Sequence, residues 1–425
     1  MANPNAAVNG TGALVLVENG GARAQSHAHW AMILLLFLLC LSPTVSQGQV
    51  PTGRTLPGVP DSPFPYATPE ESGLSSEPVN GLVATARKWV EDGDVVGAEI
   101  LLMKDRRIVL HQAVGWRDKE KGLPLERNSI YRIRSMTKPF TATAVFILME
   151  EGRLSLEDPV ARYLPSWQND SSRDITIRQL LSHTGGFVQG GFPRSFWSYG
   201  SLRAAVDAVG AAGPQHPPGE NYEYSDVGSA TLGALVEEIS GLPVEKFIQD
   251  RILEPLALTD THTAFSPEIP WASRVNPTYS RSDPGDPWAQ YWDPSQPQRF
   301  PFFRASGGLY TTILDYARWL TVFMELGVYD EGRLLSEETI REAIQPAASR
   351  GYGLHWEIFS SPPEDGELPA FGHGGSDGTL AVAMPSYGVV ALVFTQSRGG
   401  RVIRQFPMAV WNAVSAGEEN AQGEG

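Results

Sequence analysis

The sequence predicts an α+β fold: one antiparallel sheet made from both ends of the chain, with flanking helices and an inserted, mostly helical subdomain. Apolar, β-branched runs typical of strands occur early, at residues 97–103 and 107–114. Similar runs return only late, at residues 351–358, 379–384 and 388–395. In between, apolar residues recur at helical spacing. Strands grouped in this way argue against a parallel sheet, in which strands and helices alternate along the chain.

The composition allows an extensive hydrophobic core and argues against two classes of partner. The chain has 425 residues, of which 42% are hydrophobic and 19% are charged, close to the usual balance of globular proteins. Its formal net charge of -15 argues against nucleic acid or an anionic membrane surface as a partner. The sequence does not indicate an oligomeric state.

An apolar run at residues 31–41 is too short to span a bilayer comfortably, which takes about 20 residues. Small residues follow within residues 44–48, as in a signal-peptidase site. We therefore expect residues 1–48 to be a leader with a signal peptide, and the protein to be secreted or periplasmic. The alternative is an uncleaved leader that anchors the chain in a membrane. The single cysteine, Cys40, lies in this leader, so the mature chain would have neither a disulfide nor a thiol nucleophile.

Residues 49–75 are rich in proline and glycine and are predicted to form an extended linker. One folded domain is predicted at residues 76–415, with its helical subdomain at about 140–300, followed by a disordered tail at 416–425. Helices are predicted at residues 78–91, 175–186, 227–240 and 404–414, and in the stretch after Tyr131, where Val145, Leu148 and Met149 are expected to face the core.

The stretch at residues 131–150 carries a serine and a lysine three positions apart. Ser135 and Lys138 would share one helix face, where Cβ atoms at this spacing lie about 5–6 Å apart. A serine becomes a nucleophile when a base takes its proton, and a lysine can be that base if burial or charge lowers its pKa. Pro139 favours the opening turn of the helix, so the serine would also lie at the positive end of the helix dipole. The alternative is a solvated helix face without chemistry.

Two further stretches carry groups suited to catalysis. Tyr224 precedes the predicted helix 227–240, where a phenol near a lysine could shuttle a proton. The alternative there is a packed aromatic side chain at a helix start. The glycine-rich stretch 371–378 precedes the predicted strand 379–384, so its backbone N–H groups could donate to an oxyanion.

Residues 374–378 also match G-x-S-x-G, the nucleophile elbow of α/β-hydrolases. An elbow leads from a strand into a helix, whereas residues 379–384 have a strand pattern. Those enzymes also place a histidine after the serine, and none follows His373. We therefore interpret this match as accidental. The eight histidines form no metal-binding motif, and we expect neither a metal nor another cofactor.

In their order, these stretches resemble the serine β-lactamase and penicillin-binding-protein superfamily. The chain is most similar to its class C-like branch, which includes family VIII carboxylesterases and related D-aminopeptidases. The resemblance covers about residues 78–408, with further matching pieces at residues 133–142, 180–185, 307–312 and 371–374. It implies a β-lactamase/transpeptidase-like fold and a serine hydrolase that works through an acyl-enzyme.

By this resemblance, Ser135 is the acylated nucleophile and Lys138 is its proton partner. Tyr224 matches the tyrosine of the Tyr-x-Asn motif, which helps to deprotonate the serine and to protonate the leaving group. Asp226 takes the asparagine position of that motif. Its negative charge would favour a protonated Lys138, which gives Tyr224 a larger share of the proton transfer.

The same resemblance matches His373, Gly374 and Gly375 to the Lys-Thr-Gly motif on the substrate-binding sheet edge. The backbone N–H of Ser376 would join that of Ser135 in the oxyanion hole. In β-lactamases the lysine of this motif helps to hold the substrate carboxylate, whereas a histidine is mostly neutral at pH 7. The change argues for an ester or a neutral amide or peptide as substrate.

The predicted function is therefore hydrolysis of a small-molecule ester or amide/peptide substrate, most simply by a carboxylesterase. An apolar binding wall is suggested by aromatic residues that could equally be loop packing: Phe192, Phe196, Trp197, Tyr199, Trp288, Tyr291 and Trp292. The second hypothesis is a β-lactamase, D,D-peptidase or D-aminopeptidase acting on cell-wall-like peptides. The third is a catalytically inactive binding module, with Asp226 marking decay of the site.

Overall fold

The computed structural model describes residues 62–298, 300–348, 351–361, 363, 366–400 and 402–423. The leader predicted at residues 1–48 and the linker residues 49–61 lie outside the described residues. The leader and the export that it implies therefore stay predictions. Among the helices that are described, none is both long enough and apolar enough to cross a membrane.

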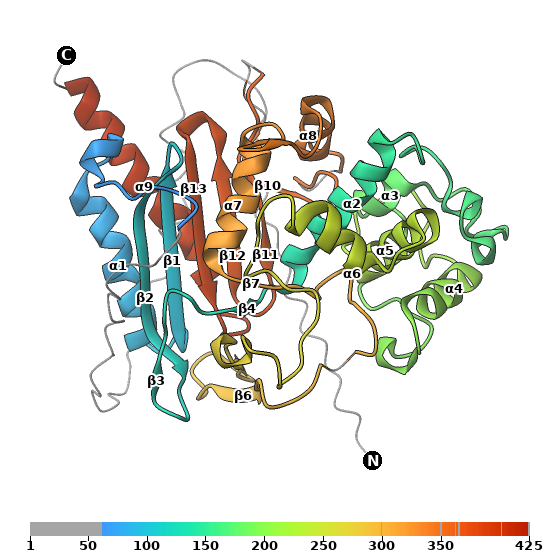
Figure 1. The fold of residues 1–425 in the computed structure, drawn as a ribbon, viewed down its shortest axis with the longest axis horizontal. Helices are drawn as coiled ribbons and strands as arrows, with labels where there is room; N and C mark the ends of the chain where they lie inside the picture. Colours follow the sequence, from blue (N-terminus) through green and yellow to red (C-terminus); the bar gives the residue numbers. More distant parts are fainter. Residues whose placement is uncertain are drawn as a thin grey trace.

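The predicted α+β architecture is confirmed: a seven-stranded antiparallel sheet lies beside a mostly helical part made from the middle of the chain (Figure 1). The strand order is β10-β11-β12-β13-β1-β2-β3. The first hairpin, β1 (Gly97–Lys104) and β2 (Arg107–Asp118), joins the late strands where β1 pairs with β13 (Val389–Thr395). The remaining strands of the sheet are β3 (Leu123–Pro124), β10 (Glu357–Ile358), β11 (Phe371–Gly375) and β12 (Thr379–Met384).

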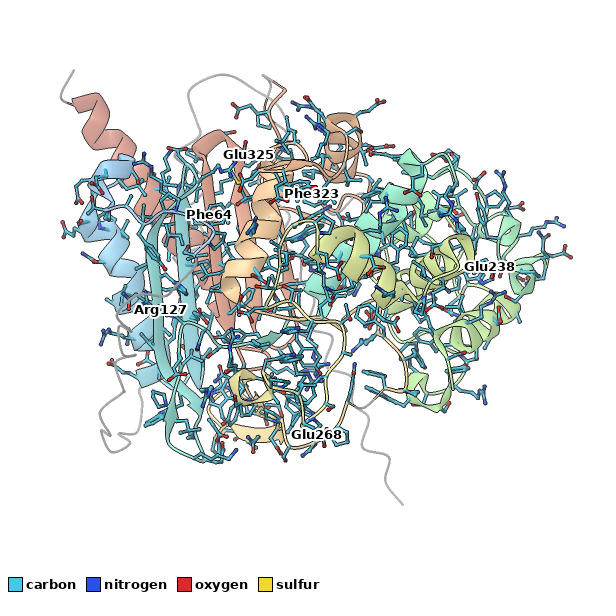
Figure 2. All side chains as sticks on the ribbon, viewed as in Figure 1. Phe64, Arg127, Glu238, Glu268, Phe323 and Glu325 are labelled. Carbon is cyan, nitrogen blue, oxygen red and sulfur yellow. The ribbon has the colours of Figure 1, made fainter. Side chains whose placement is uncertain are left out.

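Helices cover both faces of this sheet. One face carries α1 (Ser76–Glu91) and α9 (Val402–Gly423), and the other carries α7 (Ile313–Met324) (Figure 1). Helix α1 buries Val79, Leu82, Ala86 and Trp89, the spacing of a single helical face, as the sequence predicts for residues 78–91. Phe323 of α7, labelled in Figure 2, belongs to the larger core between the sheet and the helical part.

The helical part is built around α5 (Asp226–Ser240), which α2 (Lys138–Glu150) packs against. Helix α5 ends at Gly241, which is the predicted C-cap and has a left-handed φ of 78°. The other helices are α3 (Ile177–Leu181), α4 (Leu202–Ala212), α6 (Val244–Ile248) and α8 (Glu337–Ile344). Three short two-stranded ribbons complete the fold: β4 (Tyr131–Arg132) with β7 (Tyr310–Thr311), β5 (Thr278–Ser280) with β6 (Ala289–Trp292), and β8 (Val328–Tyr329) with β9 (Gly332–Arg333).

Helix α2 differs from the one-sided helix that its apolar spacing predicts. Every residue from Lys138 to Leu148 is buried, while Met149, which was expected to face the core, is only partly buried. The polar members of the helix satisfy their hydroxyls inside: Thr141 donates to the carbonyl of Ala305 and Thr143 to that of Pro139. A helix enclosed on all sides holds Lys138 away from water.

Three local predictions are wrong. Of residues 351–358, only β10 is strand, because the backbone turns at His355 (φ 64°), whose N–H donates to the carbonyl of Leu181. Residues 62–75 are not an extended linker, since Phe64 is buried in the core and Tyr66 forms a bridge to β2. Helix α9 continues through most of the predicted disordered tail at 416–425, where alanine, glutamate and glutamine favour helix.

Candidate active site

Ser135 lies in a single turn of 3-10 helix, Arg134–Thr137, immediately before α2. Pro139 stands in the first turn of α2, as predicted, so the lysine begins the helix and the serine precedes it. Ser135 is partly exposed, whereas the side chain of Lys138 is completely buried. The two polar atoms, Lys138 Nζ and Ser135 Oγ, are 3.4 Å apart.

The ammonium nitrogen of Lys138 is surrounded by oxygen atoms. It donates to Asp226 Oδ1 at 2.8 Å and to the carbonyl of Ser306 at 3.4 Å. It also lies 4.5 Å from the centre of the Tyr224 ring. Burial lowers the pKa of Lys138, and the Asp226 carboxylate opposes that shift without cancelling it. The net effect brings the amine closer to the neutral form that a base requires.

Arg304 changes the expected consequence of the aspartate. Its guanidinium donates to Asp226 Oδ2, the oxygen that does not contact Lys138. Burial would raise the pKa of Asp226, but Lys138 and Arg304 hold that pKa far below its ordinary value. When Lys138 gives up its proton, Asp226 is therefore still paired with a cation. This partner could not be predicted from the sequence, because Arg304 has no characteristic spacing to either residue.

Tyr224 lies two positions before the start of α5 and contacts both Ser135 and Lys138. Its hydroxyl shares a hydrogen bond with Ser135, and its ring faces Lys138. Burial raises the pKa of Tyr224 well above its ordinary value, and the charge of Asp226 raises it further. A lasting tyrosinate would therefore be costly, so this phenol is suited to relaying a proton and not to storing negative charge.

The glycine-rich stretch forms β11 and the turn after it, so the segment is itself a strand of the sheet. Gly375 ends β11 beside the serine turn, where an added Cβ would overlap with the carbonyl oxygen of Ile133 and the hydroxyl of Thr379. Ser376 lies in the turn that leads directly into β12. A strand-turn-strand connection is not the strand-to-helix elbow of α/β-hydrolases, which agrees with treating that match as accidental.

His373 lies behind the β11 edge and not on its surface. The ring is completely buried; Nδ1 donates to the carbonyl of Gly374 at 2.7 Å and Nε2 accepts from the Tyr352 hydroxyl at 3.1 Å. Burial, followed by the charge of Lys138, lowers the pKa of His373 to about 3. The neutral ring agrees with the sequence analysis, but its covered position argues against direct contact with a substrate.

Glu357 on β10 is a site residue that sequence reasoning missed. Its Oε1 accepts from the N–H of Gly374 at 3.4 Å and lies 3.6 Å from His373 Nδ1. Burial raises the pKa of Glu357 to about 7. A carboxyl beside the β11 edge with this pKa can change charge near neutral pH, and its charge acts on both Lys138 and Tyr224.

A pocket of about 490 Å³ opens beside Asp226. Only some of the aromatic residues that were predicted to form a binding wall line this pocket. Phe192, Phe196 and Trp197 line the pocket, as an apolar binding wall requires. Phe300, which was not singled out, stacks on Trp197 with ring centres 3.9 Å apart. The other four predicted wall residues, Tyr199, Trp288, Tyr291 and Trp292, do not line this pocket, and all but Tyr291 are buried.

Gly375→Ala is expected to lower the free energy of unfolding by about 1–3 kcal/mol and to reduce any hydrolytic activity, because the added methyl group must push β11 away from the serine turn. Denaturant unfolding measures the first effect and ester hydrolysis the second. Gly374→Ala is the matched control, since its Cβ would meet no neighbour closer than 3.7 Å. Equal stability of the two variants would show that the close approach at Gly375 is not needed.

Within the residues that the structure describes, no cluster of three or more histidine, cysteine, aspartate or glutamate side chains is arranged to hold a metal ion. The positions of Ser135, Lys138 and Tyr224 agree with their predicted convergence. Their catalytic roles stay predictions.

Comparisons with known proteins agree on one family. A family model described as Beta-lactamase matches residues 82–407. Protein Rv1367c of Mycobacterium tuberculosis is 28% identical over 369 residues, which cover 75% of this chain and 90% of that protein.

Two solved structures have a similar fold. EstCE1, described as a hydrolase with promiscuous acyltransferase activity, has a TM-score of 0.67 at 19% identity, over 81% of this chain and 99% of that one. A D-stereospecific amidohydrolase from Streptomyces sp. has a TM-score of 0.57 at 25% identity, over 74% and 93% of the two chains.

Proposed function

Because the chain belongs to the beta-lactamase family and is a serine hydrolase of that fold, we propose that it is a carboxylesterase that works through an acyl-enzyme on Ser135. The observation that carries the proposal is the placement of the Ser135 hydroxyl between two proton-transfer groups. Lys138 Nζ lies 3.4 Å from it, and the Tyr224 hydroxyl shares a hydrogen bond with it. This is the arrangement that an activated serine nucleophile needs.

In the first half of the reaction, Ser135 Oγ attacks the ester carbonyl carbon while its proton passes to Lys138, directly or through Tyr224. The negative charge on the carbonyl oxygen is stabilised by the backbone N–H groups of Ser135 and Ser376. The bond from the carbonyl carbon to the alcohol oxygen then breaks. The alcohol leaves with the proton that the serine gave up, and the acyl group remains on Ser135.

In the second half, a water molecule attacks the acyl carbon and passes its proton to the same Lys138–Tyr224 pair. The acyl bond to Ser135 breaks, the serine recovers a proton and the carboxylic acid leaves. Arg304 supports both halves, because it keeps Asp226 paired when Lys138 is neutral.

The surroundings of the nucleophile favour an ester over the alternatives. The pocket wall of Phe192, Trp197 and Phe300 suits an apolar acyl or alcohol group. The neutral, buried His373 supplies no cation for the carboxylate of a β-lactam. Both oxygens of Asp226 are already bound to cationic side chains, so it is poorly placed to hold the ammonium group of an aminopeptidase substrate.

An amidase acting on D-amino-acid amides or peptides is the second candidate, and the likeness to the Streptomyces D-stereospecific amidohydrolase is the observation that favours it. An inactive binding module is less well supported, because decay of the site would not require Arg304 to balance Asp226.

A substrate panel tests the proposal. We expect p-nitrophenyl esters to be cleaved fastest, a coloured cephalosporin and D-amino-acid p-nitroanilides far more slowly, and Ser135→Ala to lose about 10³-fold or more in kcat/KM. Intact-mass spectrometry should detect the acyl adduct on the wild-type chain and not on Ser135→Ala. Equal rates of ester hydrolysis by the wild-type protein and Ser135→Ala would show that Ser135 is not the nucleophile. Faster turnover of the cephalosporin or the anilides would reject the esterase assignment.

A further inference from the structure

A closed ring of three hydrogen bonds lies beside the nucleophile. Arg134 Nε donates to Asp377 Oδ2 at 2.5 Å, and Arg134 Nη2 donates to the Tyr291 hydroxyl at 3.0 Å. The Tyr291 hydroxyl in turn donates to Asp377 Oδ1 at 2.8 Å. The side chains of Arg134 and Asp377 are only 10% and 1% exposed. Arg134 and Asp377 are thus buried, Tyr291 is partly buried, and the three side chains form one hydrogen-bonded unit.

Two of these residues are sequence neighbours of the serines whose backbone N–H groups are proposed to form the oxyanion hole. Arg134 immediately precedes Ser135, and Asp377 immediately follows Ser376. Those two serines carry the backbone N–H groups assigned above to the oxyanion hole. Arg134 and Asp377 are 243 positions apart along the chain, so their ion pair ties the serine turn to the turn that follows β11.

The backbone at Arg134 also points to a constrained turn. Arg134 has a φ of 50°, in the left-handed region that residues other than glycine seldom adopt. Gly307 packs directly against it, since a Cβ at Gly307 would lie 3.4–3.5 Å from the backbone of Arg134. A strained conformation persists where the surroundings hold it, and such positions gather at functional sites.

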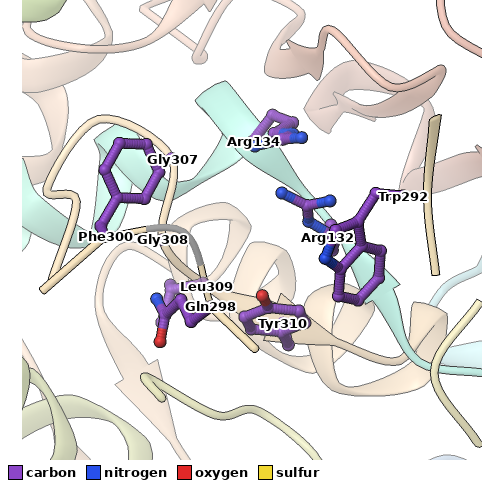
Figure 3. A pocket seen from close by; sticks show the side chains of 9 residues that line it. All are labelled: Arg132, Arg134, Trp292, Gln298, Phe300, Gly307, Gly308, Leu309 and Tyr310. Carbon is purple, nitrogen blue, oxygen red and sulfur yellow. The ribbon is translucent and has the colours of Figure 1, made fainter. Parts of the chain in front are cut away.

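The charges of the pair are well supported. Burial would lower the pKa of Arg134, but the Asp377 carboxylate raises it instead. Burial would raise the pKa of Asp377, but Arg134 and then Arg132 hold it below its ordinary value. Arg132 lies in the same pocket as Arg134, with its guanidinium over the indole of Trp292 at 4.2 Å (Figure 3). The pair therefore stays ionised at neutral pH.

We propose that the Arg134–Asp377 ion pair, braced by Tyr291, is a clamp that fixes the distance and direction of the two oxyanion-hole N–H groups. This inference rests on the proposed function of Ser135. The three are positioning residues, because they act through the backbone of Ser135 and Ser376. Since the aromatic wall of the pocket comes from other residues, the clamp acts on the tetrahedral transition states and leaves ground-state binding of an ester unchanged.

The test compares Tyr291→Phe with the double variant Arg134→Gln/Asp377→Asn, which removes both charges of the ion pair together, so that neither member is left as a buried ion without the other. We expect kcat for a p-nitrophenyl ester to fall about 10–10³-fold in the double variant and less in Tyr291→Phe, by analogy with the loss of an oxyanion-hole donor. KM should stay within about twofold. The inhibition constant of benzeneboronic acid, which forms a tetrahedral adduct with an active serine, should rise by the same factor as kcat falls.

The matched control is the ion pair of Arg274 with Asp260, which lies outside the proposed machinery. Arg274→Gln/Asp260→Asn should lower Tm and leave kcat and boronate affinity unchanged. Clamp variants that lose Tm but keep both kcat and boronate affinity would overturn the clamp. A wild-type protein without Ser135-dependent hydrolysis would overturn the proposed function first, and the catalytic role of the clamp with it.

Discussion

Replacing Lys138 with methionine is expected to lower kcat/KM for ester hydrolysis by about 10²–10⁴-fold, the usual contribution of a general base. Methionine has a similar length and can fill the buried space, but it cannot accept the proton of Ser135. The measurement is steady-state hydrolysis of a p-nitrophenyl ester near neutral pH. Intact-mass spectrometry should show that the acyl adduct forms more slowly, because acylation and deacylation both pass a proton to this amine.

The fold should tolerate this change better than most losses of a buried ion pair, which cost about 3–5 kcal/mol when they leave a charge alone. Asp226 keeps Arg304 as a partner in the Lys138→Met variant, so a smaller loss is expected in denaturant unfolding. Lys138→Arg is the control for charge, since a guanidinium stays protonated and cannot act as a base. A fully active Lys138→Arg, or Lys138→Met within threefold of the wild-type rate, would show that the base lies elsewhere.

The sequence predicted the parts of the site that depend on short spacing. Ser135 and Lys138 lie three positions apart, and Pro139 marks the start of α2, so one local turn contains most of the information. The sheet was predictable for a similar reason: residues 100–103 of β1 and 389–394 of β13 are unbroken apolar runs, and burial on both faces of a strand requires one.

The missed residues share a different property: their partners are remote. Arg304 meets Asp226 across 78 positions, and Arg134 meets Asp377 across 243. An arginine in a loop has no periodicity that identifies its partner, so only the folded chain reveals that it balances a buried carboxylate. The resemblance to a family did not supply these pairs either, because Arg304 lies outside the segments that carried it, and a matching segment that contains Arg134 does not identify its partner.

At residues 351–358, the sequence pattern predicts correctly which side chains are buried but not the path of the backbone. Tyr352, Leu354 and Trp356 alternate with smaller or polar residues, and all three are buried, as a strand pattern predicts. The backbone nevertheless turns at His355, where Leu181 accepts its N–H and leaves only β10 in the sheet. The alternation of apolar residues predicts which side chains face the core. The path of the backbone depends instead on a tertiary hydrogen bond, which the pattern does not reveal.

The balance of charge around Asp226 leads to the second large effect. The charge of Arg304 lowers the pKa of Lys138, whereas the charge of Asp226 raises it. Arg304→Gln should therefore raise the pKa of Lys138, and the acidic limb of the kcat/KM profile should move upward by on the order of one to two pH units, as for charges several ångströms apart in a partly shielded site. On that limb, the rate at a fixed pH would fall about 10–100-fold.

Three further variants test the direction in which the acidic limb moves. Asp226→Asn removes the charge that favours protonated Lys138, so it should move the same limb downward, opposite to Arg304→Gln. Arg304→Lys keeps the cation and should shift the limb least, and the double variant Arg304→Gln/Asp226→Asn should return it towards the wild-type position. Initial rates between about pH 5 and 10 for all five proteins provide the comparison. A limb that moves downward in Arg304→Gln, or does not move in any variant, would mean that proton loss from Lys138 does not control the rate, and that Asp226 and Arg304 serve the fold instead of the base.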